Sequence, residues 1–175
     1  MVTSGAGRVT RIDTSVENQP FRLIAAYAPA AAGERTAFFT NTLGPHLNKT
    51  TILGIDANCV PDVSLDVRSQ SRSAYENSGA NDLQNILITA DLIDVAREWL
   101  GNAPFFTCFK KNQGDNLSST RLDRIYAPNL NGVLWEHVSV KPDLFPRNPL
   151  ASELDHLPIE IRISSTQEQR GKDLQ

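Results

Sequence analysis

Seven segments of this 175-residue chain have the composition of β-strands, and this limits its possible folds more than any other feature. Most are rich in β-branched and aromatic residues, and the last alternates isoleucine strictly with charged residues. Polar residues ending in Pro20 separate the first two segments, as expected for a hairpin connection. The segments cover residues 7–15, 21–29, 50–58, 105–111, 119–128, 133–142 and 157–164.

Two further stretches have helical periodicity. Phe39, Leu43 and Leu47 recur every four residues, and Gly44-Pro45 is expected to kink or end that helix early. A clearer amphipathic helix is predicted where apolar residues follow the spacing i, i+3, i+4 and i+7, at Leu83, Ile86, Leu87 and Ala90. Residues 91–101 are expected to form a short helical or extended turn, and residues 61–78 a long polar loop. Many strands with two main helices favour a mixed α and β class, with a sandwich of sheets flanked by helices.

Composition narrows the function classes. With 40% hydrophobic residues and a mean hydropathy of -0.30, residues 1–163 are expected to form one soluble globular domain, followed by a polar tail at 164–175. A net charge of -3 argues against a protein that holds nucleic acid by charge alone, although a nuclease with a local cleft and a metal ion remains possible. The two cysteines, Cys59 and Cys108, predict reduced, partly buried thiols, not a disulfide framework or a zinc cluster. Without a signal peptide or a long apolar run, we expect an intracellular protein that does not associate with membranes.

Polar side chains gather at the ends of several predicted strands. Tyr27 ends one strand, Asp56 and Asn58 end another, and Asp123 lies within a third. Asp155 and His156 open the last strand. Each has an ordinary alternative. Tyr27 could be a buried ring with a hydroxyl in water, and Asp56 and Asn58 could form an Asx-type turn. Asp123 could pair with Arg121 or Arg124, and the last two residues could be a polar loop end. Together they could supply a phosphodiester hydrolase with a base, phosphate donors, a metal ligand and a histidine held by an acid.

The ordered set "YAP", "GIDAN", "FFT", "RLDRIYAP" and "LDHLPI" resembles the endonuclease/exonuclease/phosphatase superfamily. Within it, "GIDANCVPDVSLDVRSQS" looks most like the endonuclease domain of LINE-type (non-LTR) retrotransposons. The resemblance implies a four-layer α/β sandwich and Mg²⁺-dependent hydrolysis of DNA. It also implies an intracellular protein, nuclear if it acts as a retroelement endonuclease, and a possible former fusion to a reverse transcriptase.

The resemblance also implies roles for individual residues. Asp56 positions or activates the attacking water, and Asp123 orients the histidine. His156 stabilises the pentacoordinate transition state, and Asp155 lies beside the metal. The residues expected to contact the substrate phosphate are Tyr27, Asn58 and Thr107.

The chain departs from the family pattern in two ways. The family's Gly-Asp-Phe-Asn is here Ile55-Asp56-Ala57-Asn58, and its Ser-Asp-His begins here with Leu154. The family's first-strand Asn and metal-binding Glu have no match, because Glu17 and Glu34 lie in the wrong places. We therefore expect a domain truncated at its N-terminus, one sheet with an unpaired apolar edge, and weak or lost hydrolysis. The alternatives are an inactive remnant or binding module, and a phosphatase of the same superfamily that acts on a small phosphorylated substrate.

Overall fold

The computed structural model describes residues 2–4, 7–16, 18–69, 76–111, 117–129, 133–140 and 155–165. Its main sheet has six strands in the order β1-β2-β3-β4-β9-β6. Neighbouring strands are antiparallel except β3 and β4, which are parallel and joined by a helical crossover. The strands are β1 (Val2–Ser4), β2 (Val9–Val16), β3 (Gln19–Tyr27), β4 (Thr51–Asp56), β9 (Asp123–Pro128) and β6 (Leu92–Asp94).

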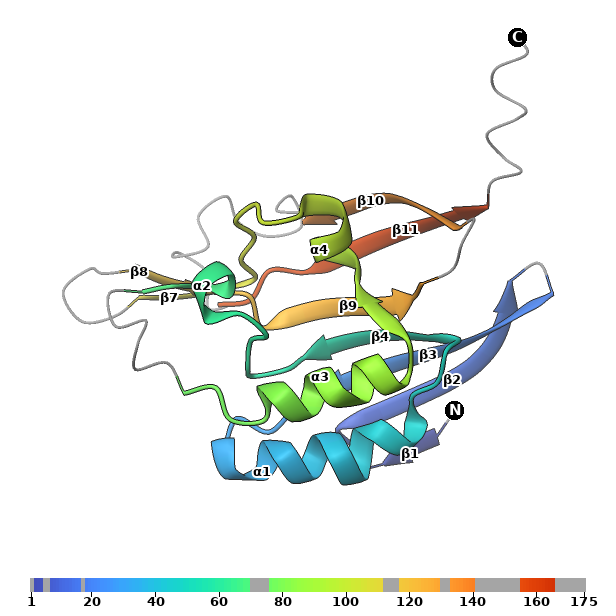
Figure 1. The fold of residues 1–175 in the computed structure, drawn as a ribbon, viewed down its shortest axis with the longest axis horizontal. Coiled ribbons are helices and arrows are strands. Elements are labelled where there is room, and N and C mark those ends of the chain that lie inside the picture. The colour runs from blue at the N-terminus through green and yellow to red at the C-terminus, as the bar shows by residue number, and fades with distance from the viewer. Residues whose placement is uncertain are drawn as a thin grey trace, which may run out of the picture.

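Two smaller sheets complete the β-structure of the described residues. One is an antiparallel pair, β10 (Val133–Val140) and β11 (Ile159–Ser165). The other has the order β5-β8-β7, formed by Val67–Arg68, Leu117–Thr120 and Cys108–Lys111. Figure 1 shows β10 and β11 beyond the β9 side of the main sheet, and β7 and β8 beside α2 (Val63–Asp66).

The crossover helix changes type along its length. It begins as α1 (Ala32–Ala37), widens into the π-helix η1 (Phe38–Leu43) and tightens into the 3₁₀ turn η2 (Gly44–His46). Gly44-Pro45 thus ends the regular helix where the sequence predicts, because proline lacks the N–H of the helical ladder. The two remaining helices are α3 (Ala80–Thr89) and α4 (Val95–Leu100).

The core lies between the main sheet and the helices. Ile24, Leu53 and Tyr126 of the sheet pack with Phe39 of η1 and Leu83 of α3. Figure 1 shows α1 and α3 side by side along the sheet. Because strand side chains alternate between faces, the neighbours of these sheet residues point to the opposite face.

On that opposite face, the segment leading into β11 covers only part of the sheet. Leu157, Pro158 and Ile159 lie beside Gly54 and Ile125 across a cavity of about 260 Å³. Further along the same face, the paired residues Ile12 and Leu23 remain 45% and 40% exposed. This part of the sheet face is therefore open, and β11 pairs only with β10 among the strands described. The expected unpaired apolar edge stays a prediction.

The fold class is confirmed: mixed α/β, with sheets flanked by helices. Residues 91–101, expected to form a short helical or extended turn, divide into β6 and α4. Two local predictions need correction. The predicted loop at 61–78 contains α2 and β5. The predicted strand at 119–128 is broken at residues 121–122, where the chain turns so that Arg121 N–H donates to the Asp66 carbonyl. The short strand β1 had no sequence prediction. No helix among the described residues is long and apolar enough to cross a membrane.

β11 extends to Ser165, slightly past the predicted domain boundary, and residues 166–175 of the predicted tail lie outside the described part of the chain. Glu17, which the sequence excludes as the family's metal ligand, also lies outside it.

Candidate active site

The centre of the site is a histidine held by an aspartate. His156 Nδ1 lies 2.8 Å from Asp123 Oδ2, a hydrogen-bonding distance, although the two residues are 33 positions apart in the sequence. His156 is positioned by a short antiparallel bridge to Cys108, and Asp123 is the first residue of β9. This contact orients the ring, because Nδ1 lies against the carboxylate and Nε2 faces away from it.

Asp56 completes the group from the neighbouring strand. It is the last residue of β4 and the register partner of Asp123 in β9. One ligand atom from each of Asp56, Asp123 and His156 lies within 4.8 Å of the others. Three chemically active side chains thus meet at one end of two adjacent strands.

The surroundings shift the protonation equilibria of two of these groups. Burial raises the pKa of Asp56, and the nearby Asp123 carboxylate raises it further, against the hydrogen bond from Asn58 N–H. The Asp123 hydrogen bond, followed by that with Cys108, raises the pKa of His156 to about 11. At neutral pH the ring is therefore a cation that donates, and Asp56 binds a proton more tightly than an ordinary aspartate.

Asn58 and Tyr27 lie around Asp56. Asn58 N–H donates to Asp56 Oδ1 at 3.0 Å with a left-handed φ of 49°, so the predicted Asx-type turn is present. Its Nδ2 donates to the Ala28 carbonyl at 2.9 Å, which ties the ends of β3 and β4 together and leaves one amide N–H for another acceptor. Tyr27 pairs with Asp56 in the strand register and is 49% exposed, beneath the guanidinium of Arg8.

Thr107 lies behind the site. Its side chain is fully buried, and its hydroxyl accepts hydrogen bonds from the N–H groups of Leu122 and Asp123 at 3.2 and 3.0 Å. Its carbonyl accepts from Leu157 N–H at 2.7 Å. In this position Thr107 braces both the Asp123 and the His156 segments. Its predicted contact with the substrate phosphate stays a prediction.

Asp155 lies on the outer side of His156. Its Oδ1 is 3.9 Å from His156 Nε2, and its side chain is 54% exposed. Magnesium prefers oxygen ligands and usually keeps several waters and substrate phosphate oxygens, with only one or two protein carboxylates. Asp56 and Asp123 carry such oxygens in one group of ligand atoms within 4.8 Å of one another, whereas Asp155 belongs to a second group with Cys108. The donor set of the Asp56 group fits Mg²⁺ if water and phosphate complete the coordination.

Sequence reasoning gave no site role to Cys108, which forms a second group of ligand atoms within 4.8 Å with Asp155 and His156. It also missed a residue behind the site. Arg124, fully buried, donates to the Cys59 carbonyl at 2.8 Å and favours the ionised form of Asp56. The alternation Asp123, Arg124, Ile125, Tyr126 places Arg124 on the opposite face of β9 from Asp123, and this was the available signal.

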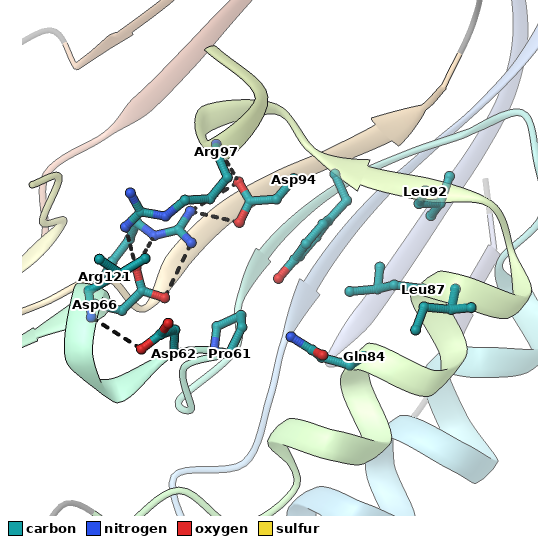
Figure 2. Close-up of a pocket in the computed structure, with 12 residues that line it drawn as sticks. Pro61, Asp62, Asp66, Gln84, Leu87, Leu92, Asp94, Arg97 and Arg121 are labelled. Atoms are coloured by element: carbon teal, nitrogen blue, oxygen red, sulfur yellow. Dashed lines mark hydrogen bonds and ion pairs between the residues drawn. The ribbon is translucent and has the colours of Figure 1, made fainter. Parts of the chain in front are cut away.

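On that opposite face, a cavity of about 360 Å³ is bordered by a buried charge network. Figure 2 shows Arg97 and Arg121 converging on Asp66, with Asp94 also reaching Arg121. The alternative pairing of Asp123 with Arg121 or Arg124 is not seen, because both arginines are engaged here while Asp123 contacts His156.

No protein-family model and no curated protein sequence matches the chain. Solved structures do. The endonuclease domain of TRAS1, a telomere-specific non-LTR retrotransposon, matches with a TM-score of 0.62 and 14% identity, over 91% of this chain and 65% of that one. The chain has the endonuclease/exonuclease/phosphatase fold.

Two further structures share this endonuclease/exonuclease/phosphatase fold. An AP endonuclease from Archaeoglobus fulgidus matches with a TM-score of 0.62 and 18% identity, over 89% of this chain and 65% of that one. The 3' phosphatase NExo from Neisseria, solved with a product DNA hairpin, matches with a TM-score of 0.57 and 17% identity, over 88% of this chain and 64% of that one. The chain thus spans slightly less than two thirds of the length of these proteins.

Proposed function

We propose that this chain is a metal-dependent phosphodiesterase of the retrotransposon endonuclease type that acts on DNA, with weak activity. The observation that carries the proposal is the 2.8 Å contact of His156 with Asp123, beside Asp56 at the end of the adjacent strand. The fold supports it, since the structural neighbours include a retrotransposon endonuclease domain and an enzyme solved with a product DNA. If the chain acts in this way on chromosomal DNA, its place of action is the nucleus.

The residues divide the chemistry as follows. His156, a cation at neutral pH, donates from Nε2 to a phosphate oxygen as negative charge grows on it. Asp123 fixes the ring and stabilises its charge, as the buried acid does in a catalytic triad. Asp56, whose pKa is raised, is the group suited to orient water and accept its proton. Asn58 and Tyr27 are available to donate to the phosphate.

A divalent cation would neutralise charge on the phosphate, with Asp155 as the exposed carboxylate that faces it. Few carboxylate oxygens remain for this task, because Asp123 Oδ2 is engaged by His156 and Asp56 Oδ1 by Asn58. This shortage is the reason we propose weak hydrolysis for these 175 residues.

Nicking of supercoiled plasmid with and without Mg²⁺ tests the proposal. We expect slow, Mg²⁺-dependent nicking that is lost in His156→Ala and retained in His46→Ala, a matched change in the remote turn η2. Nicking that survives His156→Ala would overturn the site assignment.

A phosphatase of the same superfamily that acts on a small phosphorylated substrate is the second candidate. One neighbour with the same fold is a phosphatase, although its product is DNA. The same preparations should be assayed for release of phosphate from inositol phosphates. Phosphate release without nicking would favour this candidate. No turnover in either assay would favour an inactive remnant or binding module.

A further inference from the structure

Cys108 has no role in the proposed hydrolysis, yet the thiol of Cys108 lies at the candidate active site. One ligand atom from each of Cys108, Asp155 and His156 lies within 4.8 Å of the others. Cys108 is 2% exposed, whereas Asp155 is open to solvent. Sulfur, imidazole nitrogen and carboxylate oxygen are the three ligand types that zinc takes in proteins.

The backbone holds Cys108 opposite His156, with Asp155 next to His156 in the chain. Cys108 and His156 form an antiparallel bridge. On its two sides, Phe109 N–H donates to the Asp155 carbonyl at 2.8 Å, and Leu157 N–H donates to the Thr107 carbonyl at 2.7 Å. The cluster is therefore fixed by paired strands, and only the side chains need to adjust when a metal binds.

The orientation of the imidazole also suits a metal. Histidines that bind metals almost always donate their other ring N–H to a carboxylate or carbonyl, which fixes the tautomer and strengthens the ligand. Asp123 Oδ2 accepts this bond from His156 Nδ1 at 2.8 Å. The remaining nitrogen, Nε2, lies 3.9 Å from Asp155 Oδ1.

The distance between the oxygen and nitrogen ligands requires little movement. In a tetrahedral site with Zn–S near 2.3 Å and Zn–N or Zn–O near 2.0 Å, ligand atoms lie roughly 3.3–3.6 Å apart. The separation of Asp155 Oδ1 and His156 Nε2 exceeds this by a few tenths of an ångström, and an exposed aspartate can close such a gap by rotation. Three protein ligands leave the fourth position open to water.

We propose that Cys108, His156 and Asp155 form a zinc site that overlaps the candidate active site. On binding, the metal displaces the Sγ proton of Cys108 and the Nε2 proton of His156 to solvent. The soft thiolate makes this a site for zinc and related transition metals, unlike the oxygen ligands that suit magnesium. A bound zinc ion occupies the Nε2 that would donate to phosphate, so it inhibits hydrolysis wherever hydrolysis occurs.

Cobalt(II) substitution tests the site without requiring any enzymatic activity. The protein is titrated with Co²⁺ at mildly alkaline pH, because the metal must replace protons on two ligands. We expect a thiolate-to-cobalt charge-transfer band and the visible bands of tetrahedral Co²⁺, both saturating at a single equivalent and both removed by Zn²⁺. Excess Mg²⁺ should leave them unchanged.

Variants assign the ligands. Cys108→Ser, close in size but without a thiolate, should abolish the charge-transfer band, and Cys59→Ala, which changes the other free thiol, should retain it. Circular dichroism verifies that each variant is folded. The proposal is overturned if the native chain shows no charge-transfer band, if Cys108→Ser retains it, or if Mg²⁺ displaces Co²⁺.

Discussion

The most exacting stability prediction concerns the carboxylate of Asp66, which is 1% exposed and lies among three arginines. Its Oδ1 is 2.7 Å from Arg121 Nε and also accepts from Arg97, while its Oδ2 is 3.5 Å from Arg124 Nη2. Arg121 also pairs with Asp94, so two carboxylates face three guanidinium groups, as Figure 2 shows for all but Arg124. Asp66→Asn keeps the shape of the side chain and removes its charge.

The expected cost follows from burial. Arg121 and Arg124 are 1% and 0% exposed, so water cannot solvate the charges that Asp66 leaves behind. Breaking a buried ion pair by removing one partner costs about 3–5 kcal/mol, against about 0–1 kcal/mol for an exposed pair. Because a domain is stable by only about 5–15 kcal/mol, we expect Asp66→Asn to lose a large fraction of the free energy of unfolding.

Urea unfolding followed by fluorescence and circular dichroism measures this loss. The matched control is Asp91→Asn, the same chemical change at an exposed residue whose φ of 56° asparagine tolerates well. We expect the control to stay within about 0.5 kcal/mol of the native chain. A loss below about 1 kcal/mol for Asp66→Asn would refute the reasoning, because the network would then behave as a solvated one.

The pH dependence gives a second check. Burial, the largest influence, raises the pKa of Asp66, but the hydrogen bond from Arg121 and the charges of Arg124 and Arg121 outweigh it and hold the pKa below 3.8. A carboxylate with a lowered folded-state pKa contributes stability above pH 3.8 that is lost as the pH falls through the folded-state value. The difference between the native chain and Asp66→Asn should therefore be full at neutral pH and smaller at about pH 3.

Three further predictions concern single residues. Asp123→Asn should lower the pKa of His156 from about 11 toward 6.5, measured by NMR titration of the ring protons; an unchanged value would assign the shift to other neighbours. Thr107→Val should cost about 1–3 kcal/mol in urea unfolding, because two N–H groups lose their acceptor; an unchanged midpoint would contradict the bracing role. Gly79→Ala should lower the free energy of unfolding by more than about 1 kcal/mol, since φ is 86° and the added Cβ would lie 2.7 Å from a side-chain carbon. Its control is Gly33→Ala in α1, where the added Cβ meets nothing within 4 Å, so this change should be neutral or stabilising.

The sequence predicted the principal strands and both main helices because their signals are local. Alternation and four-residue spacing follow directly from the geometry of strands and helices. The corrections arise where a distant contact overrides the local pattern. Residues 119–128 have continuous strand composition, yet Arg121 turns away to reach Asp66, which lies 55 positions earlier in the chain. No local pattern encodes such a partner.

The candidate site was predictable only in part, for the same reason. The order of the motifs predicted that Asp56, Asp123 and His156 share one site, and the structure places one ligand atom of each within 4.8 Å of the others. The position of Cys108 opposite His156 depends on a bridge between segments 48 residues apart, which composition cannot reveal. Thr107 was expected to contact the substrate phosphate, and nothing in its local sequence indicates that the chain folds over its side chain and buries it.

Strand β9 separates the chemistry of the site from the stability of the scaffold. Asp123 points toward His156, and the next residue, Arg124, points to the opposite face toward Asp66. Asp66→Asn should therefore lower the free energy of unfolding while the pKa of His156 stays raised. Asp123→Asn should lower that pKa with a smaller loss of stability, because His156 is partly exposed and water can replace the lost bond. If both variants changed both quantities equally, the two faces of β9 would be one coupled network, and the assignment of Asp123 to chemistry and Asp66 to stability would fail.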